Sequence, residues 1–502
     1  MRVVVSALLL AGCYQQSAVT PCTLTCSDSP CPSGLVCGSD FVCQAPGMPL
    51  CSTTIMGDAN DAGDAGAPPG LYIKAPNPDR DDLFGTSIAL SSDGSWLAVG
   101  APGEASNAML IDGSQTDNSL ADAGAVFIYK WDGSSYVFAT YVKSPSPDIG
   151  DHFGASISLS ANGNVLAVGV PDEDGGGVDL TGNPTDDSVT NVGAVFIYAR
   201  TSIAAAWAQT RYIKPPAAVA QGHFGQSVSL SADGAVVAIG YPGNESAFRI
   251  KFTPSYIGYG GIPNGASAGD GVGTAVAVAG NGDTLFGGAP FEDGPDTGFA
   301  GNPATNGATD AGAVYIETLN GAQNRYCKAS NTGANDHFGA AITSDETAAV
   351  FAVGAPGEDS NATVTDGDQT NNASIDAGAV YVFGRTGAAS WVQTEYVKAP
   401  NAGGENFGSS VALTSVGTFL VVGAVGEGGR SGAAFTFEKT TSWQLRSTLK
   451  APNHDPGDEL GASVDVSDDR LVVAAGAPHE ASTSSEPSDN SSPNAGAVYV
   501  FR

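Results

Sequence analysis

Carboxylate side chains recur at one position of this 502-residue sequence, shortly after an apolar run that ends in Gly-x-Pro or a close variant. A Glu stands there seven times: Glu104, Glu173, Glu245, Glu292, Glu358, Glu427 and Glu480. Two of these positions lie among further carboxylates, and the candidate ligands there are Asp172, Glu173, Asp174, Asp179, Glu358, Asp359, Asp366, Asp368 and Asp376. Because Ca²⁺ prefers hard oxygen ligands, these segments are candidate calcium sites.

A structural role competes with calcium for the same glutamates. A Lys also recurs six times, each time upstream of one of these glutamates: Lys74, Lys143, Lys214, Lys328, Lys398 and Lys450. Each Glu could pair with such a Lys or accept hydrogen bonds from nearby loop amides. A residue present in every repeat more often supports the fold than forms one site, so the structural role is favoured. Calcium is the one cofactor that the sequence suggests.

The carboxylates belong to a unit that is repeated seven times. An apolar residue followed by Gly opens each copy: Phe84, Phe153, Phe224, Val272, Phe338, Phe407 and Leu460. A Gly follows sixteen residues later in every copy: Gly100, Gly169, Gly240, Gly288, Gly354, Gly423 and Gly476. Such regular self-similarity is typical of a repeat architecture.

Each copy has the pattern of four β-strands. In the second copy, "ASISLS" alternates and "VLAVGV" is continuously apolar, with Asn162-Gly163 between them as a tight hairpin turn. "GAVFIY" and "RYIKPP" supply the third and fourth strands. Seven such units predict an all-β, seven-bladed β-propeller. Residues 71–76 are predicted to complete the last blade, closing the ring and removing an exposed edge. The propeller domain therefore spans residues 71–502.

The repeat resembles the FG-GAP repeat of the integrin α-subunit N-terminal propeller and its bacterial relatives. Phe84-Gly85 with Gly100-Ala101-Pro102 matches that pattern outright, as does Phe338-Gly339 with Gly354-Ala355-Pro356. The resemblance implies cell-surface adhesion. Integrin repeats often carry an Asp-x-Asp-x-Asp-Gly calcium loop between the two motifs, whereas a tight turn fills that space here. Any calcium would therefore bind in the long loops instead: Gly103–Ala123, Asp172–Val192, Phe291–Ala311, Gly357–Ala377 and His479–Ala495.

Catalytic motifs are missing from the sequence. It contains no Ser-His-Asp order, Walker loop or HExxH motif. His152, His223 and His337 occupy one repeat position, directly before Phe-Gly. Because equivalent positions are spread around a propeller, we expect these histidines to form neither a shared metal site nor a catalytic pair. The sequence predicts a protein that is not an enzyme.

The N-terminal 70 residues predict export. Residues 1–12 resemble a bacterial lipoprotein signal peptide whose cleavage would leave Cys13 to be acylated, although an ordinary secretory signal is the alternative. Residues 13–52 form a Cys-rich segment, and residues 53–70 a flexible linker rich in Gly, Ala, Asp and Pro. Three disulfides of unspecified pairing are predicted among Cys22, Cys26, Cys31, Cys37, Cys43 and Cys51, with zinc as the competing interpretation. Cys327 is expected to be a small buried residue.

The net charge of the chain limits the kinds of partner that it could bind. The formal net charge of −32 disfavours nucleic acid, which requires clustered Lys and Arg. The sequence therefore predicts a lipid-anchored module at the bacterial outer membrane or cell surface, touching the membrane through its anchor alone. Its acidic loops would meet a protein or polysaccharide ligand in binding or adhesion. The alternative is a structural cell-envelope protein that contacts itself or other lipoproteins, and a carboxylate-dependent hydrolase is a third, less favoured hypothesis.

Overall fold

The computed structural model describes residues 36–37, 43–44 and 70–502, except 179–181, 254–255, 263–266, 300, 320–324, 388–389, 402, 454 and 485–486. The chain divides into two units, Met1–Ile55 and Met56–Arg502. The first contains β1 (Val36–Cys37) and β2 (Cys43–Gln44), which pair antiparallel with Cys37 opposite Cys43. The predicted signal, the acylated Cys13, the disulfide side chains and the linker up to residue 69 lie outside the described residues.

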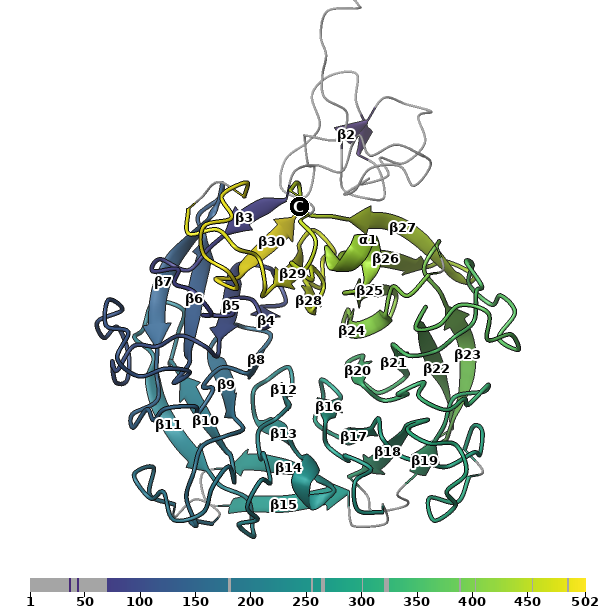
Figure 1. Ribbon diagram of the computed structural model, residues 1–502, viewed down its shortest axis with the longest axis horizontal. Coiled ribbons are helices and arrows are strands. Elements are labelled where there is room, and N and C mark those ends of the chain that lie inside the picture. The colour runs from purple at the N-terminus through teal and green to yellow at the C-terminus, as the bar shows by residue number, and fades with distance from the viewer. Residues whose placement is uncertain are drawn as a thin grey trace, which may run out of the picture. The chain divides into compact units, whose positions relative to one another are not determined.

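The second unit is a seven-bladed β-propeller of four-stranded antiparallel sheets. Figure 1 shows the sheets arranged as a ring, each running outward from the centre. Blade 1 comprises β4 (Ser87–Leu90), β5 (Trp96–Ala101), β6 (Ala125–Trp131) and β7 (Tyr136–Val142); blade 2 comprises β8 (Ser156–Leu159), β9 (Val165–Val170), β10 (Ala194–Ala199) and β11 (Ala208–Ile213). Blade 3 comprises β12 (Val228–Leu230), β13 (Val236–Tyr241), β14 (Ser246–Thr253) and β15 (Tyr256–Ile262).

The other blades repeat this order from the centre outward. Blade 4 comprises β16 (Ala275–Val278), β17 (Thr284–Ala289), β18 (Ala313–Thr318) and β19 (Arg325–Cys327); blade 5 comprises β20 (Ala341–Ser344), β21 (Val350–Ala355), β22 (Ala379–Gly387) and β23 (Ser390–Val397). Blade 6 comprises β24 (Phe407–Leu413), β25 (Phe419–Ala424), β26 (Ala433–Lys439) and β27 (Trp443–Leu449). Blade 7 comprises β28 (Ser463–Val466), β29 (Val473–Ala477), β30 (Ala497–Phe501) and β3 (Leu71–Ile73).

The last blade thus combines strands from both ends of the propeller. β3 pairs antiparallel with β30, with Tyr72 opposite Tyr499 and Ile73 opposite Val498. Figure 1 shows the purple and yellow ends of the chain side by side in this sheet. Among the described residues, helical structure is confined to a 3₁₀ turn at Pro242–Asn244 and to α1 (Glu427–Arg430), and none of it is long and apolar enough to cross a membrane.

The second strand of each blade is buried on both faces because neighbouring blades pack against it. All residues of β5, β13, β17 and β25 are buried, as the continuous apolar runs predict. Tight turns join strands one and two. In blade 1 the Asp93 carboxylate accepts hydrogen bonds from Ser95 N (2.9 Å) and from the hydroxyl of Ser91 (2.6 Å). Gly94 takes the positive φ of 62° that this turn requires.

Adjacent blades meet through glycines. A Cβ placed on Gly354 would lie 2.0 Å from the carbonyl oxygen of Gly408 in the next blade. The same conflict, at 1.9–2.1 Å, arises at Gly100, Gly169, Gly240, Gly288, Gly423 and Gly476. The Gly after the apolar opening residue of one blade therefore touches the Gly of the preceding blade's second strand. Within one blade the two glycines are joined by a hydrogen bond, as from Gly339 N to Gly354 O (3.0 Å), which accounts for their constant spacing in the repeat.

A circle of hydrogen bonds runs around the opposite face, where strands one and two are joined (the hairpin face). Each donor reaches the next blade: Ser92 N to Ala161 O (2.9 Å), Ala161 N to Ala232 O (2.9 Å), Ala232 N to Gly280 O (2.8 Å), Asn281 N to Glu346 O (2.8 Å) and Glu346 N to Ser415 O (2.9 Å). Ser415 N then donates to the Asp468 carboxylate (2.7 Å). Asp468 N donates to Ser92 O (2.8 Å), which joins blade 7 to blade 1.

Replacing one contact glycine is expected to disrupt a blade interface. Gly354→Ala should lower the free energy of unfolding by about 3 kcal/mol or more, because backbone on both sides must shift to admit the methyl group. Gly387→Ala is the matched control, since the nearest atom to its Cβ is Ser390 Cβ at 3.6 Å. Denaturant unfolding of both variants measures the difference. Equal stability of the two would contradict the contact.

Candidate functional site

The recurrent carboxylates gather on the face where strand one begins and the long loops lie (the loop face). Five loops between strands two and three are long: residues 102–124, 171–193, 290–312, 356–378 and 478–496. Blades 3 and 6 have short connections there, at residues 242–245 and 425–432. Loops carried by a rigid scaffold commonly hold binding residues. The loop face is therefore the candidate location of a binding site.

Six of the seven recurrent glutamates pair with the recurrent lysine of their own blade. The Nζ–O distances are 2.9 Å for Lys74–Glu480, 3.0 Å for Lys143–Glu104, 2.6 Å for Lys328–Glu292, 2.8 Å for Lys398–Glu358 and 3.0 Å for Lys450–Glu427, and Lys214 also contacts Glu173. All but Lys450 are almost fully buried. The structural interpretation of these glutamates is confirmed in these six blades.

The same glutamates organise the loops that follow them. Besides its Lys, Glu292 accepts hydrogen bonds from the Tyr326 hydroxyl (2.7 Å) and from Gly294 N (3.0 Å). Glu104 accepts from Ser106 N (3.1 Å). In blade 3, Glu245 instead accepts from the amides of Gly269 (2.7 Å) and Val272 (3.0 Å). Glu245, which does not pair with a recurrent lysine, thus still accepts hydrogen bonds from loop amides.

Burial sets the ionisation of these pairs. Loss of hydration lowers the pKa of Lys74, Lys143, Lys328 and Lys398, while the paired carboxylates oppose that shift. Burial likewise raises the pKa of Glu173 to about 7 despite its contact with Lys214. Two charges removed from water remain stable only when each satisfies the other, so neither partner can be removed alone.

A second set of recurrent carboxylates was missed by the sequence analysis. Each lies two residues before the opening apolar residue and is buried: Asp82, Asp151, Asp270, Asp336, Glu405 and Asp458. Asp336 accepts a hydrogen bond from Gly333 N (2.7 Å), and Asp82 from Asp79 N (2.7 Å). Burial raises the pKa of Asp82 to about 8 and that of Asp336 to about 7. The repeated spacing was visible in the sequence, but nothing in it marked these aspartates as buried.

Most predicted calcium ligands already contact other groups of the protein, and three of them accept hydrogen bonds within their own loops. Asp174 accepts from Asn191 N (2.6 Å) and Asp359 from Asp376 N (3.0 Å), so both fix the end of a long loop. Asp366 accepts from Tyr396 N (2.9 Å), which fastens its loop to β23. Asp368 accepts from Thr370 N (2.9 Å) and is exposed, as is Asp376.

Among the described residues, no group of three or more His, Cys, Asp or Glu side chains is arranged to hold a metal ion. Asp179 lies outside the described residues. Calcium binding by the long loops therefore stays a prediction. Cys327 is fully buried in β19, and burial raises the pKa of its thiol well above the usual value.

Asp172 brings together two histidines that the sequence analysis placed apart. Its carboxylate contacts Nδ1 of His152 in its own blade (2.6 Å) and Nδ1 of His223 in blade 3 (2.8 Å). The hydrogen bond and the charge of Asp172 raise the pKa of His152, and the two imidazoles hold the pKa of Asp172 at about 2 despite burial. Equivalent positions in adjacent blades can therefore meet on one side chain. His337 lacks this arrangement because Gly357 replaces the Asp, and its ring packs edge-on against Phe291.

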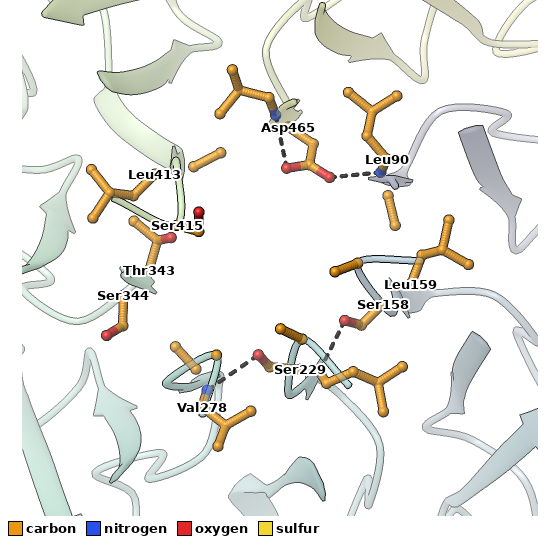
Figure 2. A pocket seen from close by; sticks show the side chains of 18 of the residues that line it. Leu90, Ser158, Leu159, Ser229, Val278, Thr343, Ser344, Leu413, Ser415 and Asp465 are labelled. Carbon is orange, nitrogen blue, oxygen red and sulfur yellow. Dashed lines mark hydrogen bonds between the residues drawn. The ribbon is translucent and has the colours of Figure 1, made fainter. Parts of the chain in front are cut away.

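A cavity of about 310 Å³ occupies the centre of the ring near the hairpin face. Figure 2 shows Ser158, Ser229 and Asp465 around it, each accepting a hydrogen bond from an inner-strand amide. Those donors are Leu230 N (2.9 Å), Val278 N (3.2 Å) and Leu90 N (2.7 Å). Loss of hydration raises the pKa of Asp465 to about 6. The cavity wall is thus polar, and these side chains join blade 2 to blade 3, blade 3 to blade 4 and blade 7 to blade 1.

Residues 443–501, from β27 through β30, match the family model described as "FG-GAP repeat". This match and the seven-bladed ring fit an FG-GAP propeller. Its other blades carry the same glycine contact and the same spacing, although the family model matches the last repeat alone. An FG-GAP propeller fits a protein-interaction module.

The chain is also similar to solved structures. One is hydrazine synthase from Kuenenia stuttgartiensis, with 12% identity over 82% of this chain and 96% of that chain, and a TM-score of 0.45. Another is the Cps50 (Swd1) β-propeller domain from Myceliophteria thermophila, with 12% identity over 86% of this chain and 99% of that chain, and a TM-score of 0.48. No curated protein sequence matches the chain.

Removing one partner of a buried pair is expected to destabilise the propeller. Glu358→Gln leaves the Lys398 ammonium buried without its counter-charge, which should lower the free energy of unfolding by about 3 kcal/mol. Glu438→Gln is the control, because Glu438 pairs with the part-exposed Arg446 and Arg470 and should lose less than about 1 kcal/mol. Replacing both partners, Glu358→Leu with Lys398→Met, should recover most of the loss. Denaturant unfolding tests all three, and equal losses for the two single variants would contradict the prediction.

Asp336 is expected to make stability depend on pH. Its raised folded pKa, about 7, means that the folded protein binds a proton that the unfolded chain has released above its ordinary pKa of 3.8. Its contribution to stability is therefore present at low pH and is lost as the pH rises towards about 7. Asp336→Asn, which stays neutral, should gain thermal stability relative to the parent as the pH is raised from about 5 to about 8. The exposed Asp376→Asn serves as control, and parallel pH profiles for parent and Asp336→Asn would contradict the assignment.

Proposed function

We propose that this protein is an exported binding module, anchored at the bacterial cell surface through an acylated Cys13, that presents its loop face to a protein or glycan ligand. The lipoprotein-like residues 1–12 support the anchor, and the net charge of −32 favours a ligand other than nucleic acid. The disulfide-rich segment and linker would hold the propeller away from the membrane. Adhesion is the biological role that the integrin-like repeat suggests.

One observation carries the proposal: the loop face separates a constant buried framework from a variable exposed surface. The Lys–Glu pairs recur in six blades beneath the loops. Above them, large apolar side chains are exposed, including Met109 (58%), Val364 (63%) and Ile375 (75%). These exposed residues differ from one loop to another. A rigid base with varied loop tips is the usual design of a recognition surface.

The same division favours binding over catalysis. A hydrolase would need two carboxylates free to exchange protons with a substrate. The recurrent carboxylates of the loop face accept hydrogen bonds from lysines, tyrosines or backbone amides instead. We therefore propose a role without catalysis.

Crosslinking on intact cells tests the proposed function. A photo-reactive residue at position 364 or 375 would sample the loop face, and one at Val416, which is 61% exposed, would sample the hairpin face. We expect adducts with a different protein or with polysaccharide from the loop-face positions and not from Val416. Adducts between two copies would favour the alternative of a structural envelope protein. Equal labelling from both faces would contradict the proposal.

We also propose that the long acidic loops bind calcium, although the structural interpretation of their carboxylates carries more weight. Binding to the folded state alone stabilises it by about 2.7 kcal/mol at a hundredfold excess of ligand over its dissociation constant. Calcium binding therefore predicts a thermal midpoint that rises with calcium and falls with chelator. Sodium chloride at equal ionic strength is the control. A thermal midpoint that depends on ionic strength alone would contradict calcium binding by the loops.

The pairing of β3 with β30 supports a further structural proposal, that residues 71–76 close the ring. Lys74 adds an ion pair to Glu480 and a hydrogen bond to Gly496 O (2.5 Å) at the same place. Deleting residues 71–76 should lower the thermal midpoint, because it exposes the edge of β30 and leaves Glu480 buried without its lysine. Deleting the predicted linker, residues 53–70, is the control and should leave the midpoint unchanged. Equal midpoints for the two deletions would contradict ring closure.

A further inference from the structure

A second cavity lies on the loop face at the boundary between blades 6 and 7, with a volume of about 530 Å³. Most of the residues that line it carry polar side chains, which are Arg430, Asp455, Asp458, Glu459, His479, Asn490 and Asn494. Blade 6 is one of the two blades with a short loop, and α1 stands where other blades have about twenty residues. The cavity is therefore left uncovered on the side of blade 6. Its volume is in the range of ligand pockets, about 300–1,000 Å³.

Contacts within the protein hold this wall in place before any ligand arrives. The carbonyl oxygen of Arg430 accepts hydrogen bonds from Gly457 N and Glu459 N, both at 3.0 Å, so α1 is fastened to blade 7. Asn490 donates to the Asp455 carboxylate (3.1 Å), and Asn494 shares a hydrogen bond with His479 Nδ1 (3.0 Å). Polar groups that are already ordered lose less entropy on binding a ligand.

The charges of the wall point to a neutral ligand. The Arg430 guanidinium contacts Glu459 and is 70% exposed, and His479 Nε2 lies 3.6 Å from the other Glu459 oxygen. A purely anionic ligand would meet Asp455, Asp458 and Glu459, and a purely cationic one would meet the arginine. Like charges brought together in an interface cost several kcal/mol, so an anion is disfavoured, whereas a cation finds Glu459 already paired with Arg430 and Asp455 already hydrogen-bonded to Asn490.

Hydrogen-bond donors and acceptors both line the cavity. A guanidinium offers five N–H donors, an amide offers both a donor and an acceptor group, and a carboxylate accepts up to four hydrogen bonds. A hydroxyl group both donates and accepts, so a ligand with neighbouring hydroxyls satisfies such a mixed wall better than a peptide of fixed pattern. Pro456, Pro493 and Ala481 add apolar surface that suits C–H groups.

We propose that this cavity, the blade 6–7 cleft, binds a neutral, hydroxyl-rich sugar unit. The inference rests on the proposed function and narrows its ligand to a neutral glycan. Arg430, from blade 6, and Asn490, from blade 7, donate hydrogen bonds to the sugar hydroxyls. Glu459 and Asp455 accept from the same hydroxyls, and the prolines contact the ring carbons.

Ligand-observed NMR on the full chain tests the cleft directly. The probes are maltose, cellobiose, lactose and N,N′-diacetylchitobiose, each at millimolar concentration, with glucuronic acid and glucosamine as charged comparisons. We expect at least one neutral disaccharide to bind and both charged sugars to bind more weakly. The double variant Arg430→Ala with Asn490→Ala should weaken binding at least tenfold. His337→Gln with Asn361→Ala alters loop-face residues of blade 5 and should leave binding unchanged.

Three outcomes overturn the inference: no disaccharide binds, the charged sugars bind as well as the neutral ones, or the cleft variant binds as tightly as the parent. A fold measurement on each variant, by thermal unfolding, excludes loss of structure as the cause of weak binding. Crosslinking from positions 364 and 375 distinguishes this failure from failure of the proposed function. If no sugar binds in the cleft but a partner is still captured at positions 364 and 375, the proposed binding function stands and only the sugar assignment fails.

Discussion

The propeller depends on the contact between two glycines at each blade boundary. A carbonyl oxygen of one blade approaches the α-carbon of the next so closely that a single methyl group would fall at 1.9–2.1 Å from it. Protein interiors do not tolerate such overlap without backbone movement. The two glycines of each contact come from neighbouring repeats, while the two glycines of one repeat are joined by a hydrogen bond, as from Gly339 N to Gly354 O (3.0 Å), so their spacing within the repeat is constant. The blades can then share one packing geometry around the ring.

Close packing at the glycines leaves the recurrent glutamates buried, and the recurrent lysines neutralise their charge. Second strands buried on both faces leave little water near the start of the loops, so a carboxylate there must find a partner. Five of the recurrent lysines are almost fully buried beside their glutamates. Blade 3 avoids the pair altogether, since Glu245 caps amides and the ring of Tyr241 fills the space beside Gly222. The framework therefore admits more than one solution, provided that every buried charge is satisfied.

The sequence predicted the features that repeat within each blade. It did not predict the contacts and the burial that depend on neighbouring blades. Strand order, the Asn162-Gly163 turn and the competing structural role of Glu358 all follow from local pattern. Asp336 and its equivalents recur as regularly, but their burial depends on packing against residues of other strands. His152 and His223 meet on Asp172 because the Phe-Gly segment of blade 3 overlies the loop of blade 2. Sequence spacing describes positions within a blade and gives no distance between blades.

The pairing of β3 with β30 also bears on where the chain could begin. The first and last residues of the propeller lie in one sheet, and each blade contacts its neighbours through the same glycines and hairpin-face hydrogen bonds. In these two kinds of contact the blade boundaries are alike, apart from the Asp468 carboxylate that replaces one carbonyl in the circle. Joining the present ends and opening any exposed long loop would preserve every one of these contacts. The fold is accordingly suited to circular permutation, in which the proposed membrane tether would leave from a different blade without any change in the surface that the loops present.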